Sequence, residues 1–147
     1  MKTFPALTVS DAELASRLRL AVTRLARRLR NQLPGELSPS QLATLSSVDR
    51  LGPITLGELS AAERVKPPTM TKIVACLEDQ GLVTRTVDQH DRRVARVEAT
   101  SEGRRFLDRS RRRKDAYLAE RLRGLDASDR DALERAAAVL ERLLEAE

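Results

Sequence analysis

Aromatic side chains are nearly missing from this sequence. Phe, Trp and Tyr together make up 2% of its 147 residues, and there is no Trp. Proteins that bind RNA or single-stranded DNA stack the bases on aromatic rings. So few rings argue against that class of partner.

Cysteine and histidine occur once each, as Cys76 and His90. A single Cys cannot form an intrachain disulfide, which fits a reducing compartment, and we read Cys76 as a small space-filling side chain. His90 lies between Asp88 and Asp91, but no other His or Cys is near it in the sequence, so we expect no metal site and no cofactor. The chain also lacks a Gly-rich phosphate loop and a visible nucleophile-base pair, so we expect no catalytic residues and no enzyme activity.

Long apolar runs are missing too. No uninterrupted one is longer than that from Ala136 to Leu140, far short of the ~20 residues that cross a bilayer. No positively charged and then apolar leader opens the chain. We therefore expect a cytoplasmic protein without a membrane partner.

The sequence is rich in arginine. Lys and Arg number 27 against 22 Asp and Glu, which gives a net charge of +5. A basic excess favours a polyanionic partner, and with so few stacking rings duplex DNA fits better than RNA. A length of 147 residues with 41% apolar content is enough for one domain with a real core.

Helical periodicity begins near the N-terminus. Ser10 and Glu13 match an S-x-x-E capping box, and the Pro34-Gly35 pair ends the run. Between them, leucines recur at helical spacing (Leu14, Leu18, Leu25 and Leu29), and arginines occupy the other face. The pattern predicts a long amphipathic first helix.

Three shorter helices follow, each with its own start signal. The signals are Ser38 with Pro39 and Gln41, then Thr55 with Glu58, then the pair Pro67-Pro68. The third of these helices places apolar residues on one face (Met70, Ile73, Val74 and Leu77). Gly81 supplies the left-handed residue that ends it.

The periodicity then changes from helical to alternating. It predicts strands over residues 82–87 and 94–99, joined by a turn over 88–93. After them, Thr100 caps a fifth helix that Gly124 interrupts, and Asp126 or Ser128 starts a last one. No internal repeat or low-complexity linker breaks this order.

The order of these elements predicts a mainly α fold with a winged helix-turn-helix core. We expect a single domain over 1–147, in which 38–99 form the winged helix-turn-helix lobe. Residues 10–34 and 100–147 would then be dimerisation helices that frame it, because a thin lobe offers too little surface to cover their leucines. Such a homodimer would bind a palindromic operator with half-sites about one turn, ~10 bp, apart.

Within Thr55–Gly103, "PPTMTKIVACLEDQGLVTR" is followed by "DQHDRR" and then V-x-A-T-x-x-G. These motifs resemble those of the multiple antibiotic resistance regulator (MarR) family. Ala99 departs from the pattern, because the family usually has Leu there. The resemblance implies a sequence-specific, dimeric transcriptional regulator, a repressor that a small-molecule effector releases from DNA.

The fourth predicted helix carries the first candidate DNA contacts. Its polar face has to enter the major groove, ~12 Å wide, and present donors to base edges. The resemblance assigns Thr69, Thr71 and Lys72 to contacts with phosphates and bases, with Lys66 and Pro68 close by. The alternative is an ordinary solvated helix face.

The turn over residues 88–93, between the two predicted strands, carries the second set of candidate DNA contacts. A minor groove attracts an extended cation, above all where A·T-rich sequence narrows it, and a carboxylate two positions earlier can orient that cation. We therefore assign Arg93 to the minor groove, Asp91 to its orientation and Arg92 to a phosphate. The alternative is a solvated hairpin turn whose charges keep the protein soluble.

Effectors of the family are often lipophilic or phenolic acids. Arg17, Arg24 or Arg28 are candidates to meet such a carboxylate, but no motif marks an effector site. The basic run over residues 109–114 would touch the DNA backbone or remain solvated. The alternative function is an architectural DNA-binding protein without an effector, which would prefer no particular operator over random duplex.

Overall fold

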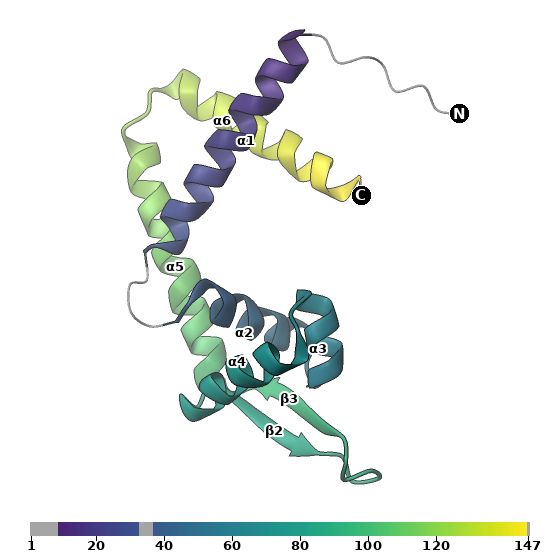
Figure 1. Cartoon of the computed structure of the whole chain (residues 1–147). Coiled ribbons are helices and arrows are strands. Elements are labelled where there is room, and N and C mark those ends of the chain that lie inside the picture. The colour runs from purple at the N-terminus through teal and green to yellow at the C-terminus, as the bar shows by residue number, and fades with distance from the viewer. Residues whose placement is uncertain (1–8, 33–36, 147) are drawn as a thin grey trace, which may run out of the picture.

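The computed structural model describes residues 9–32 and 37–146. In chain order the elements are α1 (Val9–Arg30), α2 (Pro39–Leu51), β1 (Ile54–Thr55), α3 (Leu56–Glu63), α4 (Pro67–Asp79), β2 (Val83–Val87), β3 (Ala95–Ala99), α5 (Ser101–Arg123) and α6 (Ala127–Glu145). The predicted mainly α, winged helix-turn-helix fold is confirmed. Figure 1 shows a lobe built from α2, α3, α4 and the sheet, and a helical region above it built from α1, α6 and the far half of α5.

Local capping signals start the helices of the lobe. The side chain of Ser38 accepts from the backbone N of Gln41, whose side chain accepts in return from the backbone N of Ser38. Thr55 and Glu58 form the same reciprocal pair at the start of α3. Each box satisfies two backbone N–H groups that an isolated helix end would leave without partners.

The hydrophobic core lies inside the lobe. Leu45, Leu59, Met70, Val74, Leu77 and Val97 are all fully buried and come from α2, α3, α4 and β3. The first turns of α5 add Phe106 and Leu107 to this cluster. The core therefore fixes α4 and the sheet in one rigid unit, with α5 anchored on it.

The sheet has one strand more than the sequence predicted. Its order is β1-β3-β2, and both pairs are antiparallel. β2 and β3 pair from Val83 with Ala99 to Val87 with Ala95, as expected for a hairpin. The unpredicted β1 pairs Ile54 with Val97, and at two residues it is too short to show any alternation.

The ends of the predicted helices were mostly correct. Gly81 has φ +73 after α4, and Thr100 and Asp126 cap α5 and α6. The capping box expected at Ser10 is wrong, because α1 already includes Val9. The expected stop at Pro34-Gly35 falls outside the described residues.

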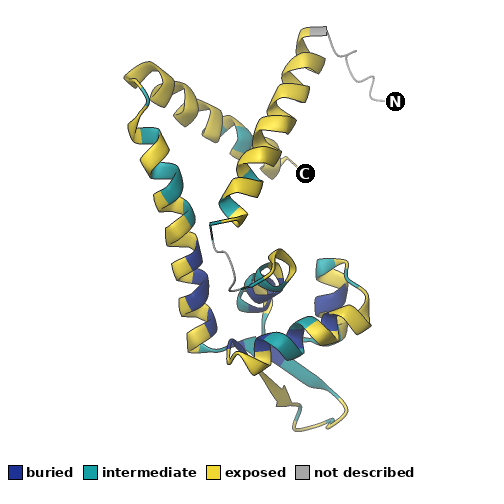
Figure 2. Ribbon diagram, turned by 60° about the vertical axis from the view of Figure 1, so that its left-hand side comes forward, coloured by how far each residue is buried: buried dark blue, intermediate teal, exposed yellow. Residues whose placement is uncertain are grey.

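Burial divides the molecule in two. Figure 2 places the buried residues in the lobe and along the adjoining part of α5, whereas α1 and α6 are exposed along most of their length. None of the described helices combines the length and hydropathy needed to cross a membrane.

Candidate nucleic-acid interface

The helix α4 presents its polar face to solvent. Lys66 is its N-cap residue in an extended conformation, and Pro67 and Pro68 occupy its first turn, where a missing N–H costs nothing. Met70, Val74 and Leu77 are buried on the opposite face. This packing sets the rotation of α4 about its axis and so decides which side chains point outward.

The five predicted contact residues of this helix all lie on the outside. They are Lys66, Pro68, Thr69, Thr71 and Lys72, and each is exposed. The hydroxyl of Thr71 donates to the carbonyl oxygen of Pro67 at 2.9 Å. Its oxygen therefore remains available as an acceptor, and its methyl group is free to contact a thymine methyl in a major groove.

The turn between β2 and β3, residues 88–93, forms the tip of the wing and carries the second set of predicted DNA contacts. Arg93 forms an ion pair with Asp91, 3.2 Å between Nε and Oδ1, and the same oxygen accepts from the backbone N of Arg93 at 3.1 Å. The Arg93 side chain is 92% exposed and that of Asp91 48%. Arg92 beside them is exposed as well. The predicted pairing of Asp91 with Arg93 is present, and it holds a cation at the surface of the tip.

Asp88 organises this tip, which the sequence analysis did not anticipate. Its Oδ1 accepts from the backbone N of His90 at 2.8 Å, and its Oδ2 lies 3.8 Å from a guanidinium nitrogen of Arg96. Aspartate often stabilises turns by accepting from the backbone two residues on. The Asp88-x-His90 spacing is the sequence signal for such a turn. In the described residues no three His, Cys, Asp or Glu side chains are grouped to bind a metal ion.

A second unpredicted contact joins helix and wing. Glu78 near the end of α4 accepts from Nε of Arg85 on β2 at 2.8 Å. The two residues lie on either side of the Gly81 turn, so no helical or strand periodicity relates them. The pair links α4 to the strand β2 beside it.

Cys76 points away from the exposed polar face. It is half-buried, and its sulfur accepts from the side-chain amides of Gln41 at 3.3 Å and Gln80 at 3.4 Å. This placement between α2 and α4 agrees with a packing role.

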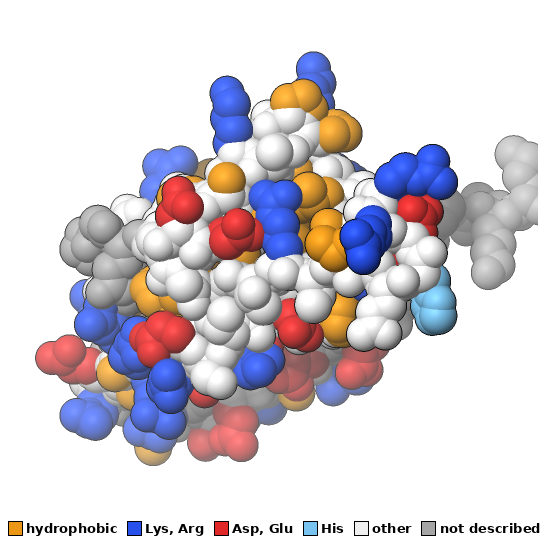
Figure 3. Space-filling model, turned by 90° about the horizontal axis from the view of Figure 1, so that it is seen from below, with side chains coloured by type: hydrophobic (Ala, Val, Ile, Leu, Met, Phe, Trp, Pro, Cys, Tyr) orange, Lys and Arg blue, Asp and Glu red, His pale blue; other side chains and the backbone are white. Residues whose placement is uncertain are grey.

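Seen from below, this end of the molecule shows neutral surface over much of its middle, with basic side chains scattered over it and projecting at the edges, and acidic side chains among them (Figure 3). An exposed polar helix face and an extended cation on a hairpin therefore share one lobe. That combination defines the class of the protein, which is a winged helix-turn-helix protein.

Comparison with known proteins gives the family. The MarR family matches residues 37–95. HTH-type transcriptional regulators of Mycobacterium bovis and Mycobacterium tuberculosis are each 42% identical over 137 residues, which are 92% of this chain and 96% of each relative. The chain belongs to the MarR family, and it is a transcriptional regulator.

Solved structures agree with this assignment. A transcriptional regulator protein from Pseudomonas aeruginosa has a TM-score of 0.81 at 38% identity, covering 94% of this chain and 98% of that one. A MarR family protein from Bacillus stearothermophilus has a TM-score of 0.76 at 27% identity, covering 95% and 99%. A mutant of Staphylococcus aureus MepR, bound to an oligodeoxyribonucleotide, shares the fold with a TM-score of 0.69 at 18% identity over 90% of this chain and 96% of that one.

Proposed function

We propose that this regulator is a homodimer that binds a palindromic DNA operator and represses transcription until a small acidic effector releases it. The observation that carries the proposal is the shared placement of the α4 polar face and the Asp91–Arg93 pair on one lobe. The oligodeoxyribonucleotide bound to the MepR mutant supports DNA as the partner of this fold. In this arrangement α4 enters a major groove, and Arg93 reaches the adjacent minor groove.

The helices outside the lobe support a homodimer. Large apolar side chains are exposed on α1 (Leu14, Leu18, Leu20, Val22 and Leu25) and on α6 (Leu133, Val139, Leu143 and Leu144). Patches of this kind on a monomer mark interaction sites. Two copies that cover these leucines would fix the separation of their two α4 helices, and hence the spacing of the half-sites.

Selection of bound duplexes from a random pool tests the DNA-binding part. We expect the selected duplexes to share an inverted repeat with half-site centres about one helical turn, ~10 bp, apart. Sedimentation of the free protein should give the mass of a dimer, and Leu18→Glu should shift it to the monomer. A pool without an enriched repeat at matched salt would favour the architectural alternative.

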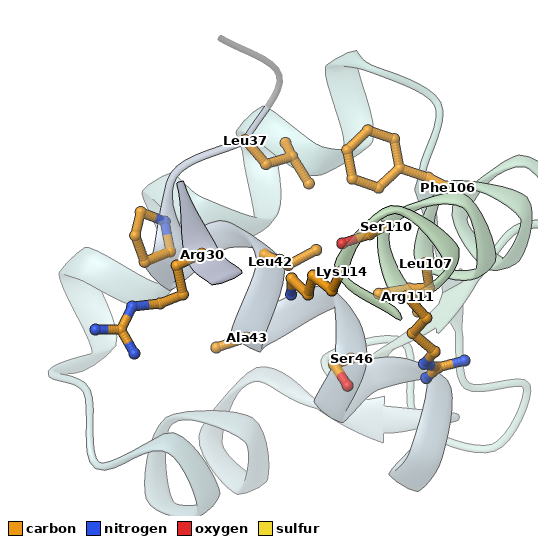
Figure 4. Close-up of a pocket in the computed structure, with 11 residues that line it drawn as sticks. Arg30, Leu37, Leu42, Ala43, Ser46, Phe106, Leu107, Ser110, Arg111 and Lys114 are labelled. Atoms are coloured by element: carbon orange, nitrogen blue, oxygen red, sulfur yellow. The ribbon is translucent and has the colours of Figure 1, made fainter. Parts of the chain in front are cut away.

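A cavity between the lobe and α5 supports an effector site. It has a volume of about 280 Å³, and its apolar walls come from Leu37, Leu42, Phe106 and Leu107. The hydroxyl of Ser110 also lines it; this residue is 2% exposed and its oxygen has no hydrogen-bond partner. In Figure 4 the Ser110 hydroxyl and the Lys114 side chain point into the space beside Leu42, whereas the guanidinium groups of Arg30 and Arg111 point away.

These groups suit a small aromatic acid. The apolar walls would hold its ring, and Lys114 would pair with its carboxylate. The arginines that the sequence analysis suggested, Arg17, Arg24 and Arg28, do not line this cavity. Their places on α1 lie outside its walls.

The position of the cavity suggests how the effector would act. Its walls come mainly from α2, which belongs to the lobe, and from α5, which leads to the dimer helices, with Arg30 at the end of α1 beside them. A ligand that binds better to one angle between lobe and α5 would favour that angle and so change the separation of the two lobes. Release of DNA requires that the favoured separation no longer matches the operator.

Benzoate is a suitable first probe. We expect calorimetry to detect its binding, and we expect it to weaken operator binding by the wild-type dimer. Lys114→Ala should abolish both effects while operator affinity without benzoate is kept. As a matched control, Lys72→Ala should bind benzoate normally. If benzoate and larger aryl acids all leave operator affinity unchanged, the effector part of the proposal fails and the DNA-binding part stands.

A further inference from the structure

The turn between α3 and α4 has an unusual backbone at Arg64. This residue caps the C-terminus of α3 with φ 53 and ψ 43, in the left-handed region. Among the described residues it is the single non-glycine with a positive φ. Its backbone N–H donates to the carbonyls of Ala61 and Ser60, which ends α3 and turns the chain toward α4.

Folding alone does not favour an arginine here. A side chain with a Cβ pays free energy in the left-handed region, while Gly avoids this cost and Asn reduces it. At the comparable turn after α4 the chain uses Gly81. Glycine would stabilise this turn better than arginine does, so the presence of arginine suggests a role for its side chain.

The side chain of Arg64 is free to take that role. It is exposed, and within the described residues it forms no side-chain hydrogen bond or ion pair. Arg85, Arg96 and Arg105, on other elements of the same lobe and at the start of α5, differ in this respect because each is paired with a carboxylate. The guanidinium of Arg64 therefore offers all of its donors to a partner outside the chain.

The surroundings of Arg64 match an anion. It lines a shallow hollow at the start of α4 together with Ser60, Val65, Lys66 and Pro67, and no carboxylate lines that hollow. Ser60 is 6% exposed, and its hydroxyl oxygen is buried without a hydrogen-bond partner. Two cations, Arg64 and Lys66, therefore meet at this hollow without an acid to neutralise them.

We propose that Arg64 binds a backbone phosphate of the operator, on the strand that flanks the groove entered by α4. This inference rests on the proposed DNA binding and adds a contact that the recognition-helix and wing motifs do not include. The first helix of a helix-turn-helix crosses the DNA backbone, and the turn after it lies at the rim of the major groove. Arg64 and Lys66 would hold one phosphate between them and set how deeply α4 enters.

Arg64→Gly separates this role from folding. The variant keeps the left-handed turn and removes the cation, so its melting temperature should equal or exceed that of the wild type. Its affinity for the selected operator should fall about tenfold, and the slope of log affinity against log salt should become shallower by about 0.9. The loss should be the same on every duplex, since a phosphate carries no sequence information.

Three further variants make the result decisive. Arg64→Asn tolerates the same backbone and should lose affinity as Arg64→Gly does, whereas Arg64→Lys should keep the salt slope. Arg123→Ala removes one positive charge from the far end of α5 and should leave affinity and slope unchanged. Wild-type affinity and slope in Arg64→Gly would overturn the inference, and so would a loss confined to one operator sequence. A wild-type protein that binds no duplex would overturn the proposed function, and the role of Arg64 with it.

Discussion

One carboxylate oxygen of Asp91 accepts hydrogen bonds from both the backbone and the side chain of Arg93. Its Oδ1 accepts from the backbone N at 3.1 Å and from Nε at 3.2 Å. The first bond fixes the backbone of the wing tip, and the second leaves the terminal guanidinium nitrogens pointing outward. Because the pair is largely exposed, it adds little to the stability of the fold. Its effect is to restrict where the cation can go.

Arg93→Ala is therefore expected to weaken operator binding without lowering the melting temperature. Loss of a charged hydrogen-bond donor should cost about 1.5–3 kcal/mol of binding free energy. The loss should be largest on operators with A·T-rich flanks, where the minor groove is narrow. Fluorescence anisotropy on a pair of operators that differ only in their flanks measures this; equal losses on both would point to a phosphate contact instead.

Asp91→Asn tests the orienting role by itself. The amide oxygen can still accept from the backbone N, but the ion pair is lost. We expect a smaller loss of affinity than for Arg93→Ala, and no further loss when both changes are combined. Additive losses in the double variant would mean that Asp91 acts independently of Arg93.

Lys72→Ala addresses the recognition helix. The residue is exposed on α4, so the fold should be unchanged, and specific affinity should fall by about 1–3 kcal/mol if the ammonium reads a base. Binding to random duplex should fall less. Arg123→Ala, with the same change in charge, is the control. Unchanged operator affinity in Lys72→Ala would remove this residue from the interface.

The parts of this fold that depend on residues close together in the sequence could be predicted from it. Ser38 with Gln41, and Thr55 with Glu58, lie three residues apart, and their side chains need no tertiary contact to cap a helix. The apolar face of α4 follows from helical spacing in the same way. The Asp91–Arg93 pair was predictable because the two residues are separated by a single position.

The features that were missed depend on residues far apart in the sequence. β1 exists only because Ile54 lies beside Val97, and two residues carry no periodicity of their own. The cavity needs Leu42 on α2 and Ser110 on α5 to face each other. Which arginines line a concave surface also depends on tertiary packing, so Arg17, Arg24 and Arg28 stay a prediction for the effector.

The start of α5 gives a prediction about pH. Hydrogen bonds from Arg105 and then Arg109 hold the pKa of Glu102 below the usual carboxyl value. A lowered folded-state pKa means that this carboxylate stabilises the fold above its unfolded pKa, and that the contribution is lost as pH falls through the folded value. Its place in the first turn, near the positive end of the helix, adds to the effect.

Glu102→Gln should therefore melt below the wild type at neutral pH, and the two melting temperatures should converge as the solution becomes acidic. Thermal unfolding followed by circular dichroism over a pH series measures the gap. If the difference between the two melting temperatures stays constant down to the lowest pH, Glu102 stabilises α5 by packing or by hydrogen bonds that do not depend on its charge.

Gly103 explains why the V-x-A-T-x-x-G motif ends in glycine. It is buried in the first turn of α5, where a Cβ would meet the carbonyl oxygen of Leu82 and come within 3.3 Å of Cδ1 of Leu45. That carbonyl also accepts from the backbone N of Thr100 at 3.0 Å, so it cannot easily move. Gly103→Ala must push α5 away from the lobe, and overpacking of this kind costs about 1–3 kcal/mol of unfolding free energy.

Gly57→Ala is the matched control. Gly57 also lies in the first half of a helix of the lobe, but a Cβ there would have nothing within 4 Å. Ala is the better helix former by up to about 1 kcal/mol, so this variant should be as stable as the wild type or more so. Urea unfolding should give Gly103→Ala a lower midpoint than the wild type and Gly57→Ala a midpoint equal to or above it. A Gly103→Ala variant as stable as the wild type would mean that α5 can shift on the lobe at little cost, a freedom that would itself favour a cavity that opens and closes between them.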